Sequence, residues 1–439
     1  MGSYVPTTAA EREQMLAQVG VKSLNDLYAA VPQEMFLHDG LNLPEGLSEL
    51  EVREKVTGLA EKNKVFKTVL RGAGSYRHFI PAVVKSVTSR EELVTCYTPY
   101  QAEISQGVLQ GTFEFQTMIC ELTGMDVANA SHYDGATAAA ETIPMCKERK
   151  RNVAYVSETT NPQVIEVMKT YCFASNTELH VVPAKDGKTD AEALKAALGE
   201  NAACFYVQQP NFFGQIEDTV ALGEITHAAG AKFVMGVNPI ACALLPTPRE
   251  VGADVAVGDG QPLGLDTAFG GPYLGFMATT SAMTRKLPGR IVGETKDVDG
   301  KTGYVQTLSA REQHIRREKA SSNICSNQAL CAFTAGVYMS AMGEDGMKQC
   351  ARLCTSKAHY LASELEKIGC KLKYTGEFFH EFVTETACPN CRKKILDALA
   401  EKNILGGAEV DGGILWCVTE LVSKEKLDEV VAIVKEVQG

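Results

Sequence analysis

A glycine-rich segment at residues 258–272 carries the most specific chemical signal in the sequence. Glycines allow tight turns and let a backbone approach a ligand closely. In enzymes that work through an imine, a turn of this kind holds a lysine, because an amine is needed to condense with a carbonyl group. The segment contains no lysine, and the amide of Gln261 cannot form an imine. The sequence therefore predicts the frame of a reactive site without its nucleophile.

A second segment, residues 131–141, combines polar side chains with a run of alanines that favours a helix. Small residues let backbone N–H groups converge, and a helix N-terminus carries partial positive charge, so this turn could hold a phosphate. The same pattern fits a helix that is merely capped by Asp134 or Thr137. The residues alone leave these two interpretations equally open.

A third segment, residues 98–107, is dense in hydrogen-bonding side chains around a proline turn. Tyr97 and Tyr100 flank that proline, and an amphipathic helix is expected over residues 109–123. The loop could shape a polar pocket. Alternatively, the tyrosines only pack, with their hydroxyls hydrogen-bonded.

Short β-branched runs alternate with helical stretches from about Arg151 onward. Near-continuous apolar runs suit strands that are buried on both faces of a mainly parallel sheet. The alternation predicts a doubly wound α/β domain that brings the polar turns to one edge of the sheet. The predicted strands are residues 152–156, 179–182, 203–207, 232–237 and 253–257, and the predicted helices between them are 161–171, 190–198 and 222–229.

Three domains are expected: an N-terminal helical arm at residues 1–70, a large α/β domain at 71–325 and a small α+β domain at 326–439. Thr8 and Glu11 fit a capping box at the start of a helix in the arm. Such short amphipathic helices rarely form a core alone, so the arm should pack on a partner or on the small domain. In the small domain we predict helices at 327–339, 349–368, 392–402 and from 424, and strands at 378–383 and 413–418.

Composition excludes several classes of function. Of the 439 residues, 45% are hydrophobic and 22% are charged, which is ordinary for a globular protein. The formal net charge of -11 does not provide the basic surface that nucleic acids require, so we expect no nucleic-acid partner. No apolar run approaches the ~20 residues of a membrane span, and an export signal is not recognisable. We expect a cytoplasmic protein without membrane contact.

The 14 cysteines are scattered along the chain, and we expect reduced thiols rather than disulfides. Cys388 and Cys391 have the spacing of a redox pair or of half a zinc site, but no second pair with that spacing completes one. Cys350 and Cys354 lie one turn apart on a predicted helix, and we interpret them as core residues. The sequence thus predicts no metal site.

Two further motifs make the pattern specific: GAGSYRHFIP at residues 72–81 and REQHIRREKASSNIC at residues 311–325. Together with the three segments above, they closely resemble the alpha subunit of glycine dehydrogenase (decarboxylating), the P-protein of the glycine cleavage system. The resemblance covers nearly the whole chain.

That resemblance implies the fold of aspartate aminotransferase, which is fold type I of the pyridoxal-phosphate (PLP) enzymes, with a mainly parallel sheet and a smaller α+β C-terminal domain. It also implies an α2β2 assembly in which the beta subunit carries PLP. The implied activity is that of an oxidoreductase: glycine is decarboxylated, CO2 is released, and the aminomethyl group passes to the lipoyl group of the H-protein.

Compared with the catalytic half of that family, the sequence departs at three cofactor positions. Gln261 takes the place of the PLP lysine, and Asn238 takes the place of the aspartate that pairs with the pyridine nitrogen. Asp134 lies near the place of a histidine that stacks on the ring. We therefore predict that this subunit holds no PLP and has no catalytic residue of its own. The degenerate pocket consists of Ser131, Tyr133, Asp134, Gly135, Thr137, Asn238 and Gln261.

The active site of this fold lies at a dimer interface, so a partner's pocket should borrow residues from this chain. The candidates for that contribution are Tyr97, Tyr100, Gln101 and Glu103, because a loop so rich in polar groups is costly to bury without a role.

Two other functions compete with this interpretation. An independent PLP enzyme would need another lysine, such as Lys301 or Lys319, although neither lies in a glycine-rich frame at a strand end. A non-enzymatic scaffold would have kept the fold and lost the complex. A homologue that bears the lysine and binds this chain would favour the subunit.

Overall fold

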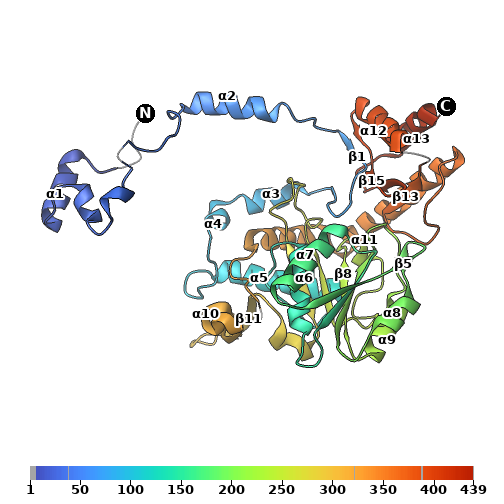
Figure 1. The fold of residues 1–439 in the computed structure, drawn as a ribbon, viewed down its shortest axis with the longest axis horizontal. Coiled ribbons are helices and arrows are strands. Elements are labelled where there is room, and N and C mark those ends of the chain that lie inside the picture. Colours follow the sequence, from blue (N-terminus) through green and yellow to red (C-terminus); the bar gives the residue numbers. More distant parts are fainter. Residues whose placement is uncertain (1–5, 38, 321, 387–388, 439) are drawn as a thin grey trace. The chain divides into compact units, whose positions relative to one another are not determined.

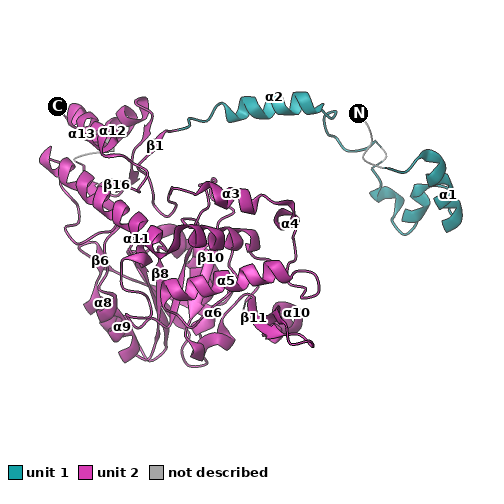
Figure 2. Ribbon diagram, turned by 180° about the vertical axis from the view of Figure 1, so that it is seen from behind, with its two compact units in different colours: residues 1–65 teal, residues 66–439 magenta. Residues whose placement is uncertain are grey.

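The computed structural model describes residues 6–37, 39–320, 322–386 and 389–438. It contains two compact units, Met1–Val65 and Phe66–Gly439 (Figure 2). The division into an arm, a large domain and a small domain stays a prediction. Within the described ranges, none of the helices is long and apolar enough to cross a membrane.

The first unit consists of short helices that form from local signals. The capping box predicted at Thr8 and Glu11 is present and starts α1 (Ala9–Val19). Ser48 and Glu51 form a second capping box at the start of α2 (Glu49–Ala60), and the 3-10 helices Leu24–Tyr28 and Gln33–Met35 lie between them. None of these helices contains a buried residue. Among its described residues, 6–37 and 39–65, this unit therefore has no hydrophobic core of its own.

A seven-stranded sheet organises the second unit (Figure 1). Its strand order is β2-β10-β9-β8-β7-β3-β4. The five predicted strands pair in parallel, which confirms the doubly wound α/β interpretation, whereas β10 pairs antiparallel with both β9 and β2. The strands are β2 (Val127–Ala128), β3 (Val153–Ser157), β4 (Glu178–Val182), β7 (Ala202–Gln209), β8 (Lys232–Val237), β9 (Val255–Asp259) and β10 (Gly275–Thr279).

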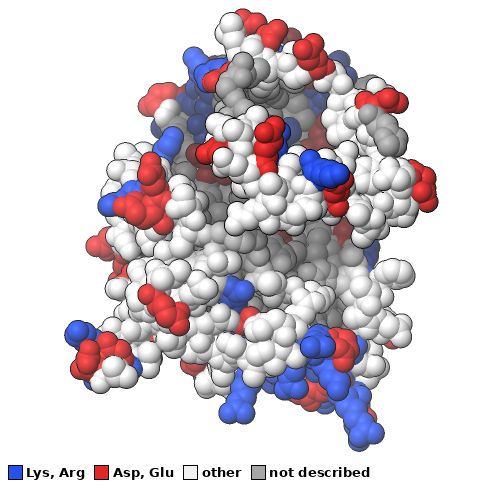
Figure 3. Space-filling view, turned by 90° about the vertical axis from the view of Figure 1, so that its left-hand side faces the viewer, with Lys and Arg blue, Asp and Glu red and all other residues white. Residues whose placement is uncertain are grey.

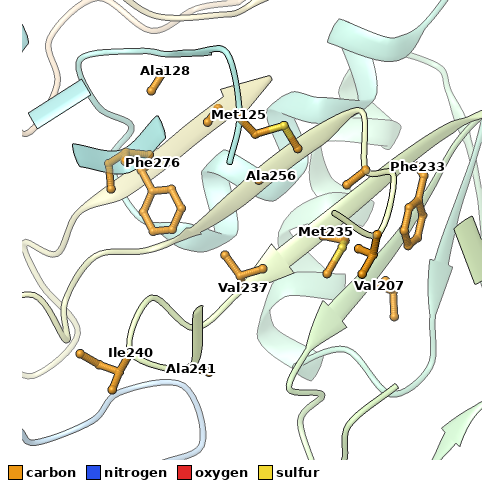
Figure 4. Packing of buried hydrophobic residues seen from close by; sticks show 14 of the residues in the cluster. Met125, Ala128, Val207, Phe233, Met235, Val237, Ile240, Ala241, Ala256 and Phe276 are labelled. Atoms are coloured by element: carbon orange, nitrogen blue, oxygen red, sulfur yellow. The ribbon is translucent and has the colours of Figure 1, made fainter. Parts of the chain in front are cut away.

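Helices cover both faces of this sheet. One face packs on α6 (Gly135–Cys146) and α7 (Pro162–Ala174), and the other packs on α5 (Gln106–Thr123), α8 (Ala191–Ala197), α9 (Thr219–Ala228) and α11 (Ala329–Lys367). Alternate strand residues point to opposite faces. Two hydrophobic clusters result, the first on the side of α6 and α7 and the second on the opposite side. Val156 belongs to the first cluster, and Tyr155 belongs to the second. Figure 4 shows members of the second cluster, including Phe233, Met235 and Val237 from β8.

A smaller layer follows α11. Its sheet has the order β13-β16-β15, with strands β13 (Glu381–Glu385), β16 (Gly413–Cys417) and β15 (Ala408–Val410). The helices α12 (Pro389–Glu401) and α13 (Lys424–Gln438) share a core with the second half of α11 around Trp416. β1 (Thr68–Val69) pairs in parallel with β14 (Ile404–Leu405), so the chain just after residue 65 is part of this layer. The helices predicted at 327–339 and 349–368 form one element that breaks at Gly343, where φ is 61°.

The remaining elements are peripheral. A hairpin that the sequence did not predict pairs β11 (Ile291–Lys296) with β12 (Thr302–Thr307). The short elements are α3 (Ala82–Thr88), α4 (Glu91–Val94), β5 (Ala184–Lys185), β6 (Lys188–Thr189) and α10 (Gln313–Arg316), with 3-10 turns at Ala241–Ala243, Ser281–Lys286, Ser309–Arg311 and Arg317–Lys319. Acidic and basic side chains are interspersed on the face drawn in Figure 3.

Candidate functional site

A cavity of about 290 Å³ lies where the parallel strands β7, β8 and β9 end. Pro210, Asn238 and Asp259 line it from these three strand ends. Ligands of open α/β sheets bind at this edge. Among the described residues that line the cavity there is neither lysine nor arginine. The full lining is Ala73, Gly74, Ser75, Tyr76, Asp134, Gly135, Ala136, Asn161, Gln163, Val164, Tyr206, Gln208, Pro210, Asn211, Gly236, Val237, Asn238, Pro239, Gly258, Asp259, Pro262, Gly270, Tyr273, His380 and Glu381.

Gln261 is a fully hydrogen-bonded structural amide. Its Oε1 accepts from the backbone N–H of Tyr76 at 2.8 Å, and its Nε2 donates to the carbonyl oxygens of Tyr76 and Leu265, both at 2.8 Å. The residue is 1% exposed and does not line the cavity. Gln261 therefore ties the 72–81 segment to the turn after β9, and it leaves no reactive group pointing into the cavity.

Carboxylates occupy the N-terminus of α6, where a phosphate would otherwise bind. Asp134 is the N-cap, and its Oδ1 accepts from the N–H of Thr137 at 2.7 Å, which confirms the capping interpretation. Asp259 Oδ2 accepts from the N–H of Gly135 at 2.9 Å. A Cβ at Gly135 would come within 2.8 Å of the Asp259 backbone nitrogen, so glycine permits this close approach. Two carboxylates at this position oppose the binding of an anion.

Burial at this position disfavours the ionised form of Asp259. Burial raises the pKa of Asp259 to about 6, against the opposing effect of the N–H donors of Gly135 and Gln261. The nearby charge of Asp134 adds to the rise. A phosphate in the cavity would raise this pKa further, since like charges disfavour ionisation.

Asn238 offers the wrong hydrogen-bonding group for a protonated pyridine ring. Its Oδ1 accepts from the N–H groups of Ile240 at 2.9 Å and Ala241 at 3.3 Å, so the oxygen is already engaged by the backbone that leads into a 3-10 turn. Its Nδ2 is buried and has no partner among the described residues. The group left for a ligand is therefore a donor, whereas a pyridinium needs an acceptor.

Two buried side chains that the sequence did not single out, His380 and Glu381, close the cavity from β13 and the residue before it. Glu381 accepts from the N–H of Ala73 at 2.7 Å and from the hydroxyl of Tyr76 at 2.8 Å. Burial lowers the pKa of His380 to about 3, so its ring is neutral, and both ring nitrogens lack partners among the described residues. An acidic residue inside an apolar strand, as at Glu381, was the sequence signal that could have revealed this wall.

The other predicted pocket residues surround α6 without lining the cavity. Ser131 is buried, and its Oγ accepts from the N–H of Gln328 at 3.0 Å. Thr137 completes the capping box with Asp134. Tyr133 is 38% exposed. Of the seven predicted positions, the structure brings Asp134, Gly135 and Asn238 together at the cavity.

The loop predicted to reach a partner lies away from this cavity. Tyr97 is 84% exposed, and Gln101 and Glu103 are exposed as well. Tyr100 is half-buried: its hydroxyl donates to Asn327 at 2.7 Å, and the guanidinium of Arg290 lies 3.9 Å from its ring centre. Of the predicted cysteine pair, Cys388 falls outside the described residues, so the pairing of Cys388 with Cys391 stays untested.

These observations show that the cavity does not fit PLP. The cofactor needs an amine, an acceptor for its ring nitrogen and a cationic or N–H-rich cradle for its phosphate. This site offers the locked amide of Gln261, the donor of Asn238 and the carboxylates of Asp134 and Asp259.

Replacing Glu381 with glutamine is expected to stabilise the protein at about pH 8 and much less at about pH 5. Burial raises the pKa of Glu381 from 4.5 to about 7, against the opposing effect of its donors Ala73 and Tyr76. Because the folded-state pKa is the higher one, the stability present below pH 4.5 is lost as the pH rises towards 7. The loss is about 3 kcal/mol, and glutamine escapes it while keeping an acceptor for Ala73.

Urea unfolding at both pH values measures this effect, with the exposed Glu366→Gln as the control that should change little at either pH. An equal effect of Glu381→Gln at the two pH values would contradict a raised pKa at this position.

The chain has the architecture of fold type I, the fold of one class of PLP-dependent enzymes, with its cavity at the carboxyl ends of the parallel strands. A solved alanine–glyoxylate aminotransferase from Nostoc sp. superposes with a TM-score of 0.62 at 14% identity, covering 92% of this chain and 100% of that one, and it shows the shared fold.

The chain belongs to the glycine cleavage system P-protein family, whose model matches residues 2–434. The crystal structure of a glycine decarboxylase (P-protein) in inhibitor-bound form is similar over 99% of this chain and 100% of that chain, with a TM-score of 0.93 and 40% identity. Proteins named "Probable glycine dehydrogenase (decarboxylating) subunit 1" are 48% identical in Desulfitobacterium hafniense and in Moorella thermoacetica. Both alignments cover 99% of this chain. They cover 100% of the Desulfitobacterium hafniense protein and 99% of the Moorella thermoacetica protein.

Proposed function

We propose that this chain is the subunit of a glycine decarboxylase that binds no PLP of its own. A PLP-bearing beta subunit joins it in an α2β2 enzyme. The complex decarboxylates glycine, releases CO2 and transfers the aminomethyl group to the lipoyl group of the H-protein. The names of the relatives, which specify a subunit 1, support a partner subunit. The many thiols, which we expect to be reduced, support a cytoplasmic location.

One observation carries this proposal: the amide of Gln261 is fixed by three hydrogen bonds. The resemblance aligns this position with the lysine of the family's catalytic half. A side chain that holds two segments together in this way has a structural role that a lysine could not perform, because an ammonium group cannot accept a hydrogen bond. The chemistry then requires a lysine from another chain.

The loop residues Tyr97, Tyr100, Gln101 and Glu103 are proposed to complete the partner's active site. Their exposure supports this role, since no described part of the chain buries Tyr97, Gln101 or Glu103. The hydrogen bond of Tyr100 to Asn327 and its contact with Arg290 give the loop a fixed base.

The experiment is to mix the purified full-length chain with PLP and to treat it with borohydride. We expect no visible absorbance from a lysine–PLP imine and no PLP attached to any peptide after reduction. A PLP-bearing partner subunit treated in the same way is the positive control. Adding that partner and lipoyl H-protein should restore release of CO2 from glycine. An imine trapped on this chain, or no activity with any lysine-bearing partner, would overturn the proposal.

An independent PLP enzyme finds no support in the site. Lys301 and Lys319 are exposed, and neither lines the cavity. Borohydride trapping also decides this alternative, because peptide mapping would identify the lysine.

A further inference from the structure

A second cluster of chemically active side chains lies outside the cavity. It brings together His78 from the 72–81 segment, Cys350 and Cys354 from α11, and Glu420 from the loop after β16. One ligand atom of each residue lies within 4.8 Å of all the others. Three separate segments of the chain thus converge on one point.

The distances in this cluster are close to those between the ligands of one metal ion. Cys350 Sγ lies 3.7 Å from His78 Nδ1, and Cys354 Sγ lies 3.3 Å from Glu420 Oε2. Zinc–ligand bonds of about 2.0–2.3 Å in a tetrahedron place neighbouring ligand atoms about 3.3–3.8 Å apart. The contact between His78 Nδ1 and Glu420 Oε2, at 2.8 Å, must lengthen to admit an ion, and all four ligand atoms lie within 4.8 Å of one another.

The cluster is closed to solvent. The side chains of His78 and Glu420 are 2% and 11% exposed, and both cysteines are buried. Buried groups of this polarity are retained when they are paired or when they coordinate a metal. Four protein ligands in a closed setting are typical of a structural zinc site, whereas a catalytic site keeps one position open.

The surroundings also suit an ion. Glu420 Oε1 accepts from the N–H of Phe79 at 2.6 Å, which orients the carboxylate so that Oε2 faces the cluster. A divalent cation with two thiolates, one carboxylate and a neutral imidazole leaves one net negative charge. The ammonium group of Lys357, which donates to the backbone oxygen of Glu420 at 2.5 Å, offsets that charge.

We propose that His78, Cys350, Cys354 and Glu420 form a structural zinc site. The mixture of sulfur, nitrogen and oxygen ligands suits zinc, while magnesium and calcium prefer oxygen ligands alone. The structure confirms that Cys350 and Cys354 are core residues, and the proposal gives them a second role that the sequence did not predict.

The ion would stabilise the position of the 72–81 segment, which lines the cavity. His78 lies two positions after Tyr76 in the sequence. Tyr76 lines the cavity and forms hydrogen bonds with Gln261 and Glu381. An ion that holds His78 to α11 and to Glu420 would therefore restrain the 72–81 segment at His78, next to the hydrogen bonds that hold it at Tyr76. The inference does not depend on the proposed function.

The test measures the metal content of the full-length chain, purified anaerobically without a metal-binding tag from zinc-replete cells. We expect about one zinc per chain that survives dialysis. Exchange for cobalt should give the intense visible bands of a tetrahedral ion and thiolate-to-cobalt charge transfer in the near ultraviolet. Cys350→Ser combined with Cys354→Ser should lower the bound metal at least about tenfold.

The matched control is Cys370→Ser, which alters another buried cysteine of the small layer and should keep the full metal content. If the double variant does not fold, wild-type chain stripped by a chelator and titrated with cobalt still decides the question. Metal-free chain that shows no cobalt bands, or metal that persists in the folded double variant, would overturn the proposal.

Discussion

Replacing Gln261 with lysine is expected to lower the free energy of unfolding by about 3 kcal/mol and not to create a PLP site. The glutamine accepts from the N–H of Tyr76 and donates to the carbonyls of Tyr76 and Leu265. Lysine can donate but cannot accept, so the buried N–H of Tyr76 loses its partner. Each buried polar group left unpaired costs about 1–3 kcal/mol, and a buried ammonium group adds its own desolvation.

Urea unfolding of the full-length variant measures the loss, and PLP absorbance with borohydride trapping measures any gain of imine chemistry. Gln261→Met removes the same hydrogen bonds without adding charge, so it separates the two contributions. Gln110→Lys, at an exposed position on α5, is the control and should be nearly neutral. If Gln261→Lys were as stable as wild type and bound PLP as an imine, the pocket would lack only an amine, and the poor fit at Asn238 and Asp134 would be irrelevant.

The central sheet could be predicted because its strands are buried on both faces. The run at residues 203–207 lies within β7, and the run at 232–237 coincides with β8. Buried parallel strands of this kind leave continuous apolar runs in the sequence. The hairpin of β11 and β12 could not be recognised in this way, because β11 is buried only at its first two residues and β12 is partly exposed throughout. Its stability comes from pairing and from contacts with α5, which no local pattern reveals.

The candidate site was predictable where its residues follow a strand or begin a helix. Asn238 follows β8 and Asp134 caps α6, so their positions can be inferred from local sequence. The partners of Glu381 and of the residues in the proposed zinc site could not be inferred, because they are distant in the chain. Tyr76 and Glu381 are 305 positions apart, and His78 and Cys350 are 272 positions apart. Convergence of this kind is a property of the tertiary fold, and one sequence carries no local signal for it.

Removing residues 1–65 is expected to leave residues 66–439 folded and to weaken binding to the partner subunit at least about a thousandfold. The second unit holds all three hydrophobic clusters, so its folding does not require residues 1–65, which form most of the predicted arm. The arm, in contrast, exposes large apolar side chains such as Val19, Leu50 and Leu59, which are 66%, 67% and 55% exposed. Burying one such side chain contributes about 1.5–3 kcal/mol, and three suffice for the expected loss of affinity.

Titration calorimetry between the truncated chain and a PLP-bearing partner measures this affinity, and circular dichroism checks that the truncated chain is folded. A finer comparison uses one helix, α2: Leu50→Ser with Leu59→Ser should weaken binding, and the matched polar pair Glu54→Ser with Lys55→Ser should not. Contact of these apolar side chains with water is unfavourable, so we expect another protein surface to bury them. If truncation instead lowered the stability of residues 66–439 and left the affinity unchanged, the arm would pack on its own chain and the interface would have to be sought elsewhere.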